Sequence, residues 1–465
     1  MHFASIDYLI FLPLVVLVYW GLPRSSRLSW LALASLGFYA SWNWVYLPLL
    51  VATIAFAWMG GLWMAKLRRS GGVGLSWVVL GLLLPLFLFK YANWVAASLE
   101  QVLPVRLGRI DAELPLGISF FTFQAIAYVV DIRRGRDAER NPVHFASFLS
   151  FFPQLISGPI VRVQELLPQL KAQPWLQPGD VGEALYRIGM GVTKKLVFAD
   201  SLRLGIVSPV FTDPSQFTGI EIAIALYAYT LQIYCDFSGY MDIAIGSGRL
   251  FGFRLPENFD RPYQATSVAE FWRRWHITLS NWVRDYVYFG LGGARTDREW
   301  KVYRNLILTM VVIGLWHKAS WTLVLYGALH GVALGINRYR RKRSGRRPGA
   351  SLSSVWGWGW RFLLTFHFIV LARILFRSEN MAMVGEVLEG LTGAYTLAPR
   401  FSPLAMGLLA LGFLLHFSPL RWDRRLSDVF RRGGPGLWTL GLSAVAVVCI
   451  LFGSEQALAF EYYQF

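Results

Sequence analysis

The feature that most constrains this chain is a set of long, nearly uncharged apolar runs, of which residues 76–97 and 437–452 are clear cases. A run of roughly 18 or more apolar residues predicts a transmembrane helix, because about 20 residues span the ~30 Å hydrocarbon core. In lipid the backbone has to satisfy its own hydrogen bonds, which excludes an open sheet. The sequence therefore predicts an all-α, polytopic transmembrane protein in a lipid bilayer.

The outer thirds of the chain divide cleanly into predicted spans. In the first third the apolar stretches fall near residues 6–22, 29–45, 47–65, 74–97 and 115–132. In the last third they fall near residues 360–376, 401–419 and 436–453. With further crossings in the middle, about ten to twelve spans are expected, together with re-entrant or interfacial helices.

The chain is strongly basic, with 45 Lys and Arg against 28 Asp and Glu and a net charge of +17. In a soluble protein this balance would suggest a nucleic-acid partner. Here the basic residues lie between apolar runs, as in cytoplasmic loops of membrane proteins, so we expect no nucleic acid. The positive-inside rule places residues 338–347, RYRRKRSGRR, in the cytoplasm and both chain termini outside it.

Patterns for disulfides, metals and bound cofactors are missing from the sequence. Its two cysteines, Cys235 and Cys449, lie far apart in apolar runs, which does not indicate a disulfide framework. No Cys/His cluster has the spacing of metal ligands, and no HExxH or Walker loop occurs. No internal repeat and no long linker divides the chain, so residues 1–465 are expected to form a single domain.

The middle third, residues 141–337, does not divide into regular spans. Its apolar stretches are interrupted by Pro153, Pro159, Pro209, Pro256 and Pro262. Charged residues also intrude, and residues 265–290 alternate aromatic and basic side chains, which predicts an amphipathic interfacial helix. Broken helices survive at membrane depth where they are buried in protein or line a water-filled cavity. The functional site is therefore expected in this third.

His317 is the first candidate for chemistry, because it stands between the apolar stretches 306–316 and 319–336. Ionisable groups in membrane segments are costly and mark functional sites by default. Burial disfavours the imidazolium, so the pKa of His317 is expected to fall, and a neutral imidazole can act as a general base. The alternative is a structural histidine bonded to a backbone carbonyl of a neighbouring helix.

Two further groups of polar residues have structural alternatives of their own. His276 ends the motif WRRWH, where Arg273 and Arg274 could meet an anionic donor, or where Trp and Arg could simply mark a membrane interface. Asp236 and Asp242 are six residues apart and would face different sides of one helix. Pairing with nearby Arg, or a structural turn at Ser238-Gly239, is the simpler explanation for these two carboxylates.

Several motifs resemble the membrane-bound O-acyltransferase family, and within it the bacterial branch of alginate O-acetylation proteins. The longest lies between residues 232 and 293 and contains YCDFSGYMDIAIGSGRL and WRRWH. The other pieces are PLGISFFTFQAIAYVVDIRRG at 115–135, FFPQLISGPIVRVQELLPQL at 151–170, GLWHKASWTLVLYGALHG at 314–331 and the ending at 462–465. The motif-bearing core covers about residues 115–340.

The resemblance implies a fold and roles for particular residues. The fold would be a ring of transmembrane helices around a central funnel. The histidine of GLWH, His317, would be catalytic, and the histidine of WRRWH, His276, would be a second catalytic residue in the funnel. No metal is implied. The candidates for binding the acyl donor are Arg273, Arg274 and Lys318.

The sequence departs from the branch at a few positions. Lys318 stands where glycine is usual, Gln154 where histidine is frequent, and Cys235 where an aromatic residue is usual, and Glu461 lies in a tail that is often apolar. A cation beside His317 would lower the pKa of the base further or meet an anionic donor. These departures leave the candidate base His317 in place.

The leading hypothesis is an acetyltransferase of a bacterial inner membrane. It would take an acetyl group from a cytoplasmic donor, acetyl-CoA, with no bound cofactor, and His317 would activate an acceptor hydroxyl. The acetyl group would pass outward to an exopolysaccharide such as alginate, through the periplasmic SGNH-type partner that the resemblance implies.

Three alternatives remain at this point. One is transfer of D-alanine to teichoic acid, with a carrier-protein donor. Another is a transporter without chemistry of its own, since broken helices and midplane polar residues occur there too. A transporter would tolerate Gln at position 317, whereas an acyltransferase that relies on a base would not. A structural scaffold is the last alternative, and it leaves the polar middle third unexplained.

Overall fold

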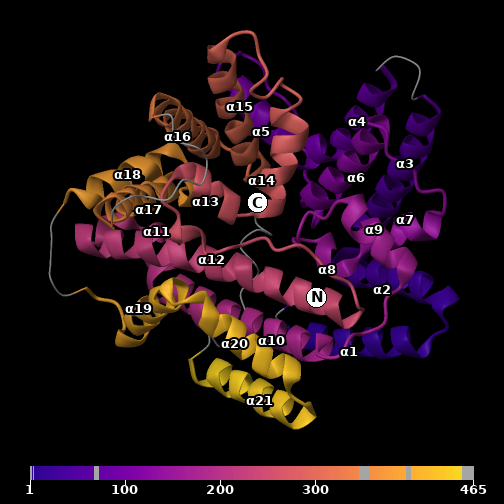
Figure 1. Ribbon diagram of the computed structural model, residues 1–465. Coiled ribbons are helices and arrows are strands. Elements are labelled where there is room, and N and C mark those ends of the chain that lie inside the picture. The colour runs from indigo at the N-terminus through magenta and orange to yellow at the C-terminus, as the bar shows by residue number, and fades with distance from the viewer. Residues whose placement is uncertain (1–2, 4, 68–72, 345–354, 394–398, 453–465) are drawn as a thin grey trace. The chain divides into compact units, whose positions relative to one another are not determined.

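The computed structural model describes residues 3, 5–67, 73–344, 355–393 and 399–452, which form helices joined by turns and loops (Figure 1). Most helices of the outer thirds lie where the apolar runs predict them. They are α1 (Ile6–Gly21), α2 (Arg24–Asn43), α3 (Leu47–Lys66), α6 (Ile118–Arg133), α17 (Val355–Arg377), α19 (Pro403–Phe417) and α21 (Pro435–Phe452). The all-α, polytopic class is thereby confirmed. The sidedness predicted for the chain termini, and the ending at 462–465, fall outside the described residues.

Among the described residues, four segments are long and apolar enough to cross a membrane. They are Arg24–Lys66, Gly74–Glu100, Gly357–Arg377 and Pro435–Phe452. A fifth arises if the bent pair Pro403–Phe417 and Leu420–Arg432 counts as one span. Further crossings would use shorter or more polar helices, so the count of about ten to twelve spans stays a prediction.

The chain forms two compact units, each assembled from separate segments. The first contains Met1–Val192, Tyr240–Pro256 and Arg424–Ala444, and the second contains Thr193–Gly239, Glu257–Asp423 and Val445–Phe465. Helix α12 (Gly219–Leu250) belongs to the second unit up to Gly239 and to the first from Tyr240. The single domain expected over residues 1–465 stays a prediction.

The first unit has an aromatic core. Its further elements are η1 (Trp44–Tyr46), α4 (Val73–Leu86), η2 (Phe87–Tyr91), α5 (Ala92–Glu100), α7 (Pro142–Ser150), α8 (Phe152–Leu155), α9 (Val163–Ala172), α10 (Asp180–Thr193) and most of α20 (Leu420–Arg432). The ring of Phe152 lies 5.3 Å from that of Phe11 and 5.6 Å from that of Phe38. The hydroxyls of Tyr8 and Ser247 are 2.7 Å apart, and this hydrogen bond connects α1 to the C-terminal part of α12.

The second unit contains most of the segments that the sequence singled out. Its further elements are η3 (Lys194–Asp200), η4 (Arg203–Val207), α11 (Ser208–Thr212), η5 (Pro214–Gln216), η6 (Pro262–Gln264), α13 (Val268–Arg274), α14 (Ile277–Val283), η7 (Arg284–Tyr288), α15 (Glu299–His317), α16 (Trp321–Ser344) and α18 (Met381–Leu391). Helices α15 and α16 form a tight antiparallel hairpin, because glycines face the partner backbone. A Cβ at Gly327 would lie 2.3 Å from the carbonyl oxygen of Met310.

One sequence-based prediction about elements is wrong. Residues 265–290 do not form one amphipathic helix, because His276 adopts a φ of 44° and separates α13 from α14. Between α17 and α19 the chain forms the short helix α18, which Asn380 caps by accepting the N–H of Met383 at 2.9 Å. A single dihedral angle ends α13, and the apolar periodicity of the sequence carries no signal for it.

Candidate active site

A sharp break between α13 and α14 places His276 in the interior of the second unit. Ser267 caps α13, since its hydroxyl accepts the N–H of Glu270 at 3.2 Å. After Trp275 the chain enters the left-handed region at His276, a conformation that costs an L-residue about 1–2 kcal/mol. The imidazole of His276 is fully buried as a result, with an exposed fraction of 0%.

His317 is the last residue of α15. Lys318 is extended, with φ −150° and ψ 141°, and ends the helix. The ring of His317 is buried and lies 5.0 Å from that of Trp316 and 5.1 Å from that of Phe376 on α17. The predicted base is therefore enclosed by aromatic side chains from two helices.

The fold brings the two candidate histidines together, although 41 positions separate them in the sequence. Their imidazole centroids are 6.4 Å apart. His276 lies outside the candidate spans, and burial lowers its pKa to about 3, which keeps its ring neutral at physiological pH. A neutral imidazole has one N–H donor and one lone pair, so the ring of His276 can both donate and accept a hydrogen bond.

Arg373 on α17 is a buried cation near this pair that the sequence reading did not single out. Its guanidinium carbon lies 4.7 Å from the ring centroid of Trp275 and 5.4 Å from that of Phe376. Cation–π contacts of this kind stabilise a guanidinium that burial would otherwise penalise. A signal was present, because Arg373 interrupts the apolar run at 360–376 and charges inside membrane segments are rare.

A cavity of about 1680 Å³ lies in the second unit, and its lining on α15 extends to Ile313, four residues before His317. Its walls come from the segment 264–288, α15, α16, the start of α17 and the end of α19. Part of the lining is apolar and includes Trp272, Leu306, Met310, Ile313 and Phe362. The cavity exceeds the roughly 300–1,000 Å³ of an ordinary small-molecule site, so it can hold a large ligand.

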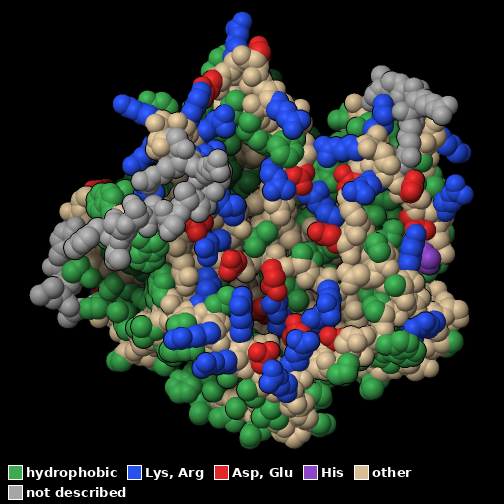
Figure 2. All heavy atoms as spheres, in the orientation of Figure 1, with side chains coloured by type: hydrophobic (Ala, Val, Ile, Leu, Met, Phe, Trp, Pro, Cys, Tyr) green, Lys and Arg blue, Asp and Glu red, His purple; other side chains and the backbone are tan. Residues whose placement is uncertain are grey.

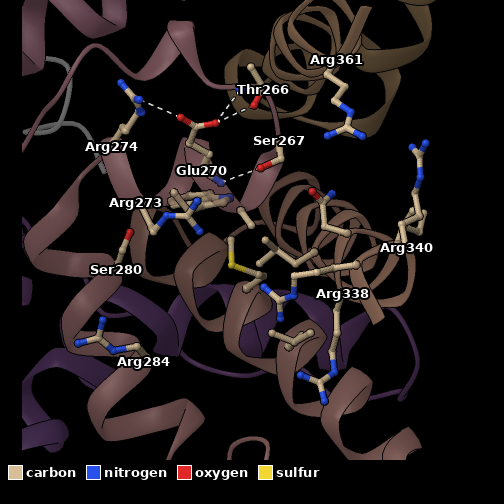
Figure 3. A pocket seen from close by; sticks show the side chains of 18 of the residues that line it. Thr266, Ser267, Glu270, Arg273, Arg274, Ser280, Arg284, Arg338, Arg340 and Arg361 are labelled. Carbon is tan, nitrogen blue, oxygen red and sulfur yellow. Dashed lines mark hydrogen bonds and ion pairs between the residues drawn. The ribbon is translucent and has the colours of Figure 1, made fainter. Parts of the chain in front are cut away.

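Arginines dominate the charged lining of this cavity. They are Arg273, Arg274, Arg284, Arg338, Arg340, Arg341 and Arg361. Among the described residues that line it, Glu270 is the acidic one, and it pairs with Arg274 at 2.8 Å. Figure 3 shows Arg273, Arg274 and Arg284 on one side and Arg338, Arg340 and Arg361 on the other. This excess of guanidinium groups favours a ligand with several phosphates.

The cavity follows one face of α15 towards His317. The lining residues of this helix are Leu306, Thr309, Met310 and Ile313. They recur every three or four positions, which is one face of an α-helix, and His317 is the next position on that face. With a rise of 1.5 Å per residue, His317 lies about 6 Å along the axis beyond Ile313. Figure 2 shows basic side chains on the surface near α15, interspersed with hydrophobic and acidic ones.

The candidates for donor binding separate into two groups. Arg273 and Arg274 both line the cavity, on the α13 side. Lys318, half-buried at the end of α15, is not among the lining residues. The arginines on α16 and α17 complete the cavity, whereas the sequence had marked residues 338–347 only as a cytoplasmic loop.

The two aspartates of the motif YCDFSGYMD have different partners, as their spacing predicted. Asp236 accepts a hydrogen bond from the Lys195 ammonium at 2.7 Å, and Asp200 contacts the same ammonium at 2.8 Å. In the first unit Asp242 pairs with Arg187 at 3.6 Å. The predicted arginine partner is therefore confirmed for Asp242, whereas the partner of Asp236 is a lysine.

Comparison with known proteins identifies relatives over most of the chain. The model of the MBOAT, membrane-bound O-acyltransferase family, matches residues 4–377. A peptidoglycan O-acetyltransferase of Helicobacter pylori is 38% identical over 418 residues, which are 82% of this chain and 78% of that protein. The probable alginate O-acetylase AlgI of Azotobacter vinelandii is 39% identical over 398 residues, covering 82% and 76%. A teichoic acid D-alanyltransferase of Streptococcus thermophilus is 29% identical over 310 residues, covering 60% and 74%.

Proposed function

The chain belongs to the membrane-bound O-acyltransferase family, and from that premise we propose that it moves an acetyl group from cytoplasmic acetyl-CoA across a bacterial inner membrane. The destination is a hydroxyl of a cell-envelope polysaccharide. The observation that carries the proposal is the buried pair of His317 and His276, 6.4 Å apart, in the same unit as an arginine-lined cavity that reaches Ile313 on the helix of His317. Family membership supports this acyltransferase over a transporter or a scaffold.

The cavity supports a coenzyme A thioester as the donor substrate. Coenzyme A carries a pyrophosphate and a further phosphate, and arginine binds phosphate oxygens in a planar, bidentate manner. The apolar stripe of Met310 and Ile313 on α15 leads from the arginines towards His317. A thioester arm lying along this stripe would bring its carbonyl carbon to the histidines while the phosphates remain among the guanidinium groups.

The transfer itself needs a base and an acid. His317 takes the proton of the acceptor hydroxyl as its oxygen attacks the thioester carbonyl. The carbon–sulfur bond breaks, the new ester forms, and the thiolate of coenzyme A receives the proton from His317. His276 supplies a neutral polar group beside this step, and the buried guanidinium of Arg373 supplies positive potential near the developing oxyanion.

Alginate is the first candidate acceptor, and the relatives named as probable alginate O-acetylases support it. Peptidoglycan is the second candidate, because a relative of similar identity is named a peptidoglycan O-acetyltransferase. Transfer of D-alanine has weaker support, from relatives at 26–29% identity. A periplasmic SGNH-type acetyltransferase is the proposed partner that completes transfer to the polysaccharide.

The experiment that tests the proposal measures acetyl transfer from labelled acetyl-CoA in membranes that contain wild type or His317→Ala at equal protein levels. We expect labelled glycan or labelled partner from wild type and a loss of at least about 100-fold in the variant, the lower range for a general base. The matched control is His367→Ala, whose exposed ring bonds to Tyr227 at 2.9 Å. Equal transfer by wild type and His317→Ala would contradict the mechanism.

A further inference from the structure

We propose that Asn258 is a positioning residue that fixes His276 as the tautomer with hydrogen on Nδ1, so that Nε2 carries the lone pair beside His317. Asn258 is buried, 1% exposed, and its side-chain oxygen lies 3.3 Å from Nδ1 of His276. The inference deepens the proposed function, because it assigns a protonation pattern to one of the two site histidines.

The orientation of the Asn258 amide follows from its other partners. The backbone N–H of Thr278 donates to the Oδ1 position at 3.0 Å, and the Thr278 hydroxyl donates to it at 3.0 Å. A backbone N–H is only a donor, so the amide atom that faces it has to be the carbonyl oxygen. The assignment of nitrogen and oxygen in this side chain is therefore decided by the main chain of α14.

The tautomer of His276 follows from that orientation. An amide oxygen only accepts hydrogen bonds, so the ring nitrogen that faces it has to donate. A separation of 3.3 Å is at the long end for such a bond, as expected for an oxygen that receives three donors. The other tautomer would set two acceptors against each other in a buried site, which is unfavourable.

Asn258 also supports the strained backbone at His276. The N–H of Ile277 donates to the backbone oxygen of Asn258 at 3.0 Å, and the N–H of Asp260 donates to the backbone oxygen of Arg274 at 2.9 Å. These bonds attach the segment 258–260 to both sides of the left-handed residue. The dihedral angle and the tautomer of His276 thus depend on the same asparagine.

The charged and titratable groups around His276 come from several elements. His317 on α15 is a titratable ring 6.4 Å away between centroids, and Trp316 and Phe237 also pack against the imidazole. On α12, Asp236 precedes Phe237 but is engaged by Lys195, and on α17 the guanidinium of Arg373 stacks on Trp275. On the same segment as His276, Arg274 is paired with Glu270.

The direct test is the ¹⁵N spectrum of the full-length protein labelled at histidine, in lipid. The chain has seven histidines, so the signals of His276 are those that disappear in His276→Gln. We expect these signals to show hydrogen on Nδ1 in wild type. Hydrogen on Nε2 would overturn the proposal, and this result does not depend on whether acetyl transfer is detected.

A kinetic test separates positioning from structural support. Asn258→Leu removes the acceptor, and we expect kcat to fall roughly 10–100-fold with little change in KM for acetyl-CoA. Asn258→Asp keeps the acceptor, and we expect it to restore a large part of kcat. Its negative charge raises the pKa of His276, so the acidic limb of the pH–rate profile moves to higher pH.

The matched control for this test is Thr278→Val, which removes one donor to the same oxygen but leaves the bond to His276. We expect its pH profile and kcat to stay near those of wild type. If folded Asn258→Leu keeps its kcat, or if Asn258→Asp gives an unshifted profile, Asn258 has only a structural role. If wild type itself transfers no acetyl group, the proposed function fails, and the ¹⁵N spectrum still decides the tautomer.

Discussion

At the scale of residues, we expect substitutions of the cavity arginines and of the buried histidines to have separable effects on the reaction. Arg338 and Arg340 line the cavity from α16, and a hydrogen bond to a charged group is worth about 1.5–3 kcal/mol. We expect the double variant Arg338→Gln/Arg340→Gln to raise KM for acetyl-CoA by about tenfold or more, with a small change in kcat. Initial rates of transfer from labelled acetyl-CoA give both constants.

Two control variants test whether the change in KM is specific to the arginines that line the cavity. Arg298 is exposed and lies 3.8 Å from Asp297, away from the cavity lining, so Arg298→Gln should leave KM within about twofold of wild type. Lys318 is not among the lining residues, so we expect Lys318→Gly also to leave KM for acetyl-CoA within about twofold of wild type. If KM rises for the Lys318 variant and not for the Arg338/Arg340 double variant, the donor binds at the end of α15 and not in the arginine-lined cavity.

The carboxyl of Glu270 on α13 is expected to make the stability of the folded protein depend on pH. Burial alone would raise the pKa of its carboxyl, but hydrogen bonds from Thr266 and the Arg274 guanidinium outweigh it and hold that pKa below the ordinary value of 4.5. A lowered folded-state pKa stabilises the protein above the unfolded-state pKa, and that stabilisation is lost as the pH falls through the folded value. We expect Glu270→Gln to unfold at a lower temperature than wild type at pH 7. The two midpoints should converge below about pH 4, and a gap that is constant with pH would contradict this assignment.

Single residues show where sequence reasoning reaches its limit. His317 and His276 were predicted because each lies in a recognisable motif and interrupts an apolar or aromatic pattern. Asn258 was not, since an asparagine between Glu257 and Phe259 has no local feature that points to a histidine 18 positions away. The role proposed for Asn258 rests on a tertiary hydrogen bond, which forms only when the chain folds back between residues 258 and 276.

At the scale of elements, the α15–α16 hairpin depends on glycine. A Cβ at Gly327 would lie 2.3 Å from the Met310 carbonyl oxygen and 2.7 Å from the Cα of Val311, both backbone atoms that cannot rotate away. Overpacking of this kind costs about 1–3 kcal/mol. We expect Gly327→Ala to lower the thermal midpoint of the purified protein and to reduce transfer, because His317 ends one of the two helices.

Gly335→Ala on the same helix is the matched control for this prediction. Its Cβ would meet the side chain of Tyr303 at 3.2 Å, and a side chain can shift. The propensity change from glycine to alanine is the same in both variants, so the difference between their midpoints reports the backbone clash. Equal midpoints would show that α15 and α16 are packed more loosely than the glycine contacts indicate.

The elements of the outer thirds were easier to predict than those of the middle. A span such as α17 is a long apolar run, and length with hydropathy is enough to find it. The segment 265–290 has regular amphipathic spacing, yet a left-handed dihedral at His276 divides it. Periodicity describes which face of a helix is buried but not where tertiary contacts break the helix.

At the scale of the whole molecule, the distribution of charge predicts how the chain is inserted. Lys and Arg cluster at 338–344, and the positive-inside rule places them in the cytoplasm, whereas the loop at Val102, 82% exposed, is predicted outside. In a background without Cys235 and Cys449, a membrane-impermeant maleimide should label Val102→Cys in intact spheroplasts. It should label Ser344→Cys only after the membrane is opened. The reverse pattern would invert the proposed sidedness and place the donor cavity outside.

The close contact of α15 with α16 also has a consequence for motion during turnover. The backbones of the two helices approach closely at Gly314 and Gly327, with no side chain between them at these positions, which opposes sliding of one helix along the other. We therefore expect the hairpin to move as one rigid body that carries both His317 and Arg338. If the cavity opens or closes around the proposed donor, the movement would have to come from α13, α14 or α17, and the distance between the proposed base His317 and the proposed phosphate contact Arg338 would stay the same.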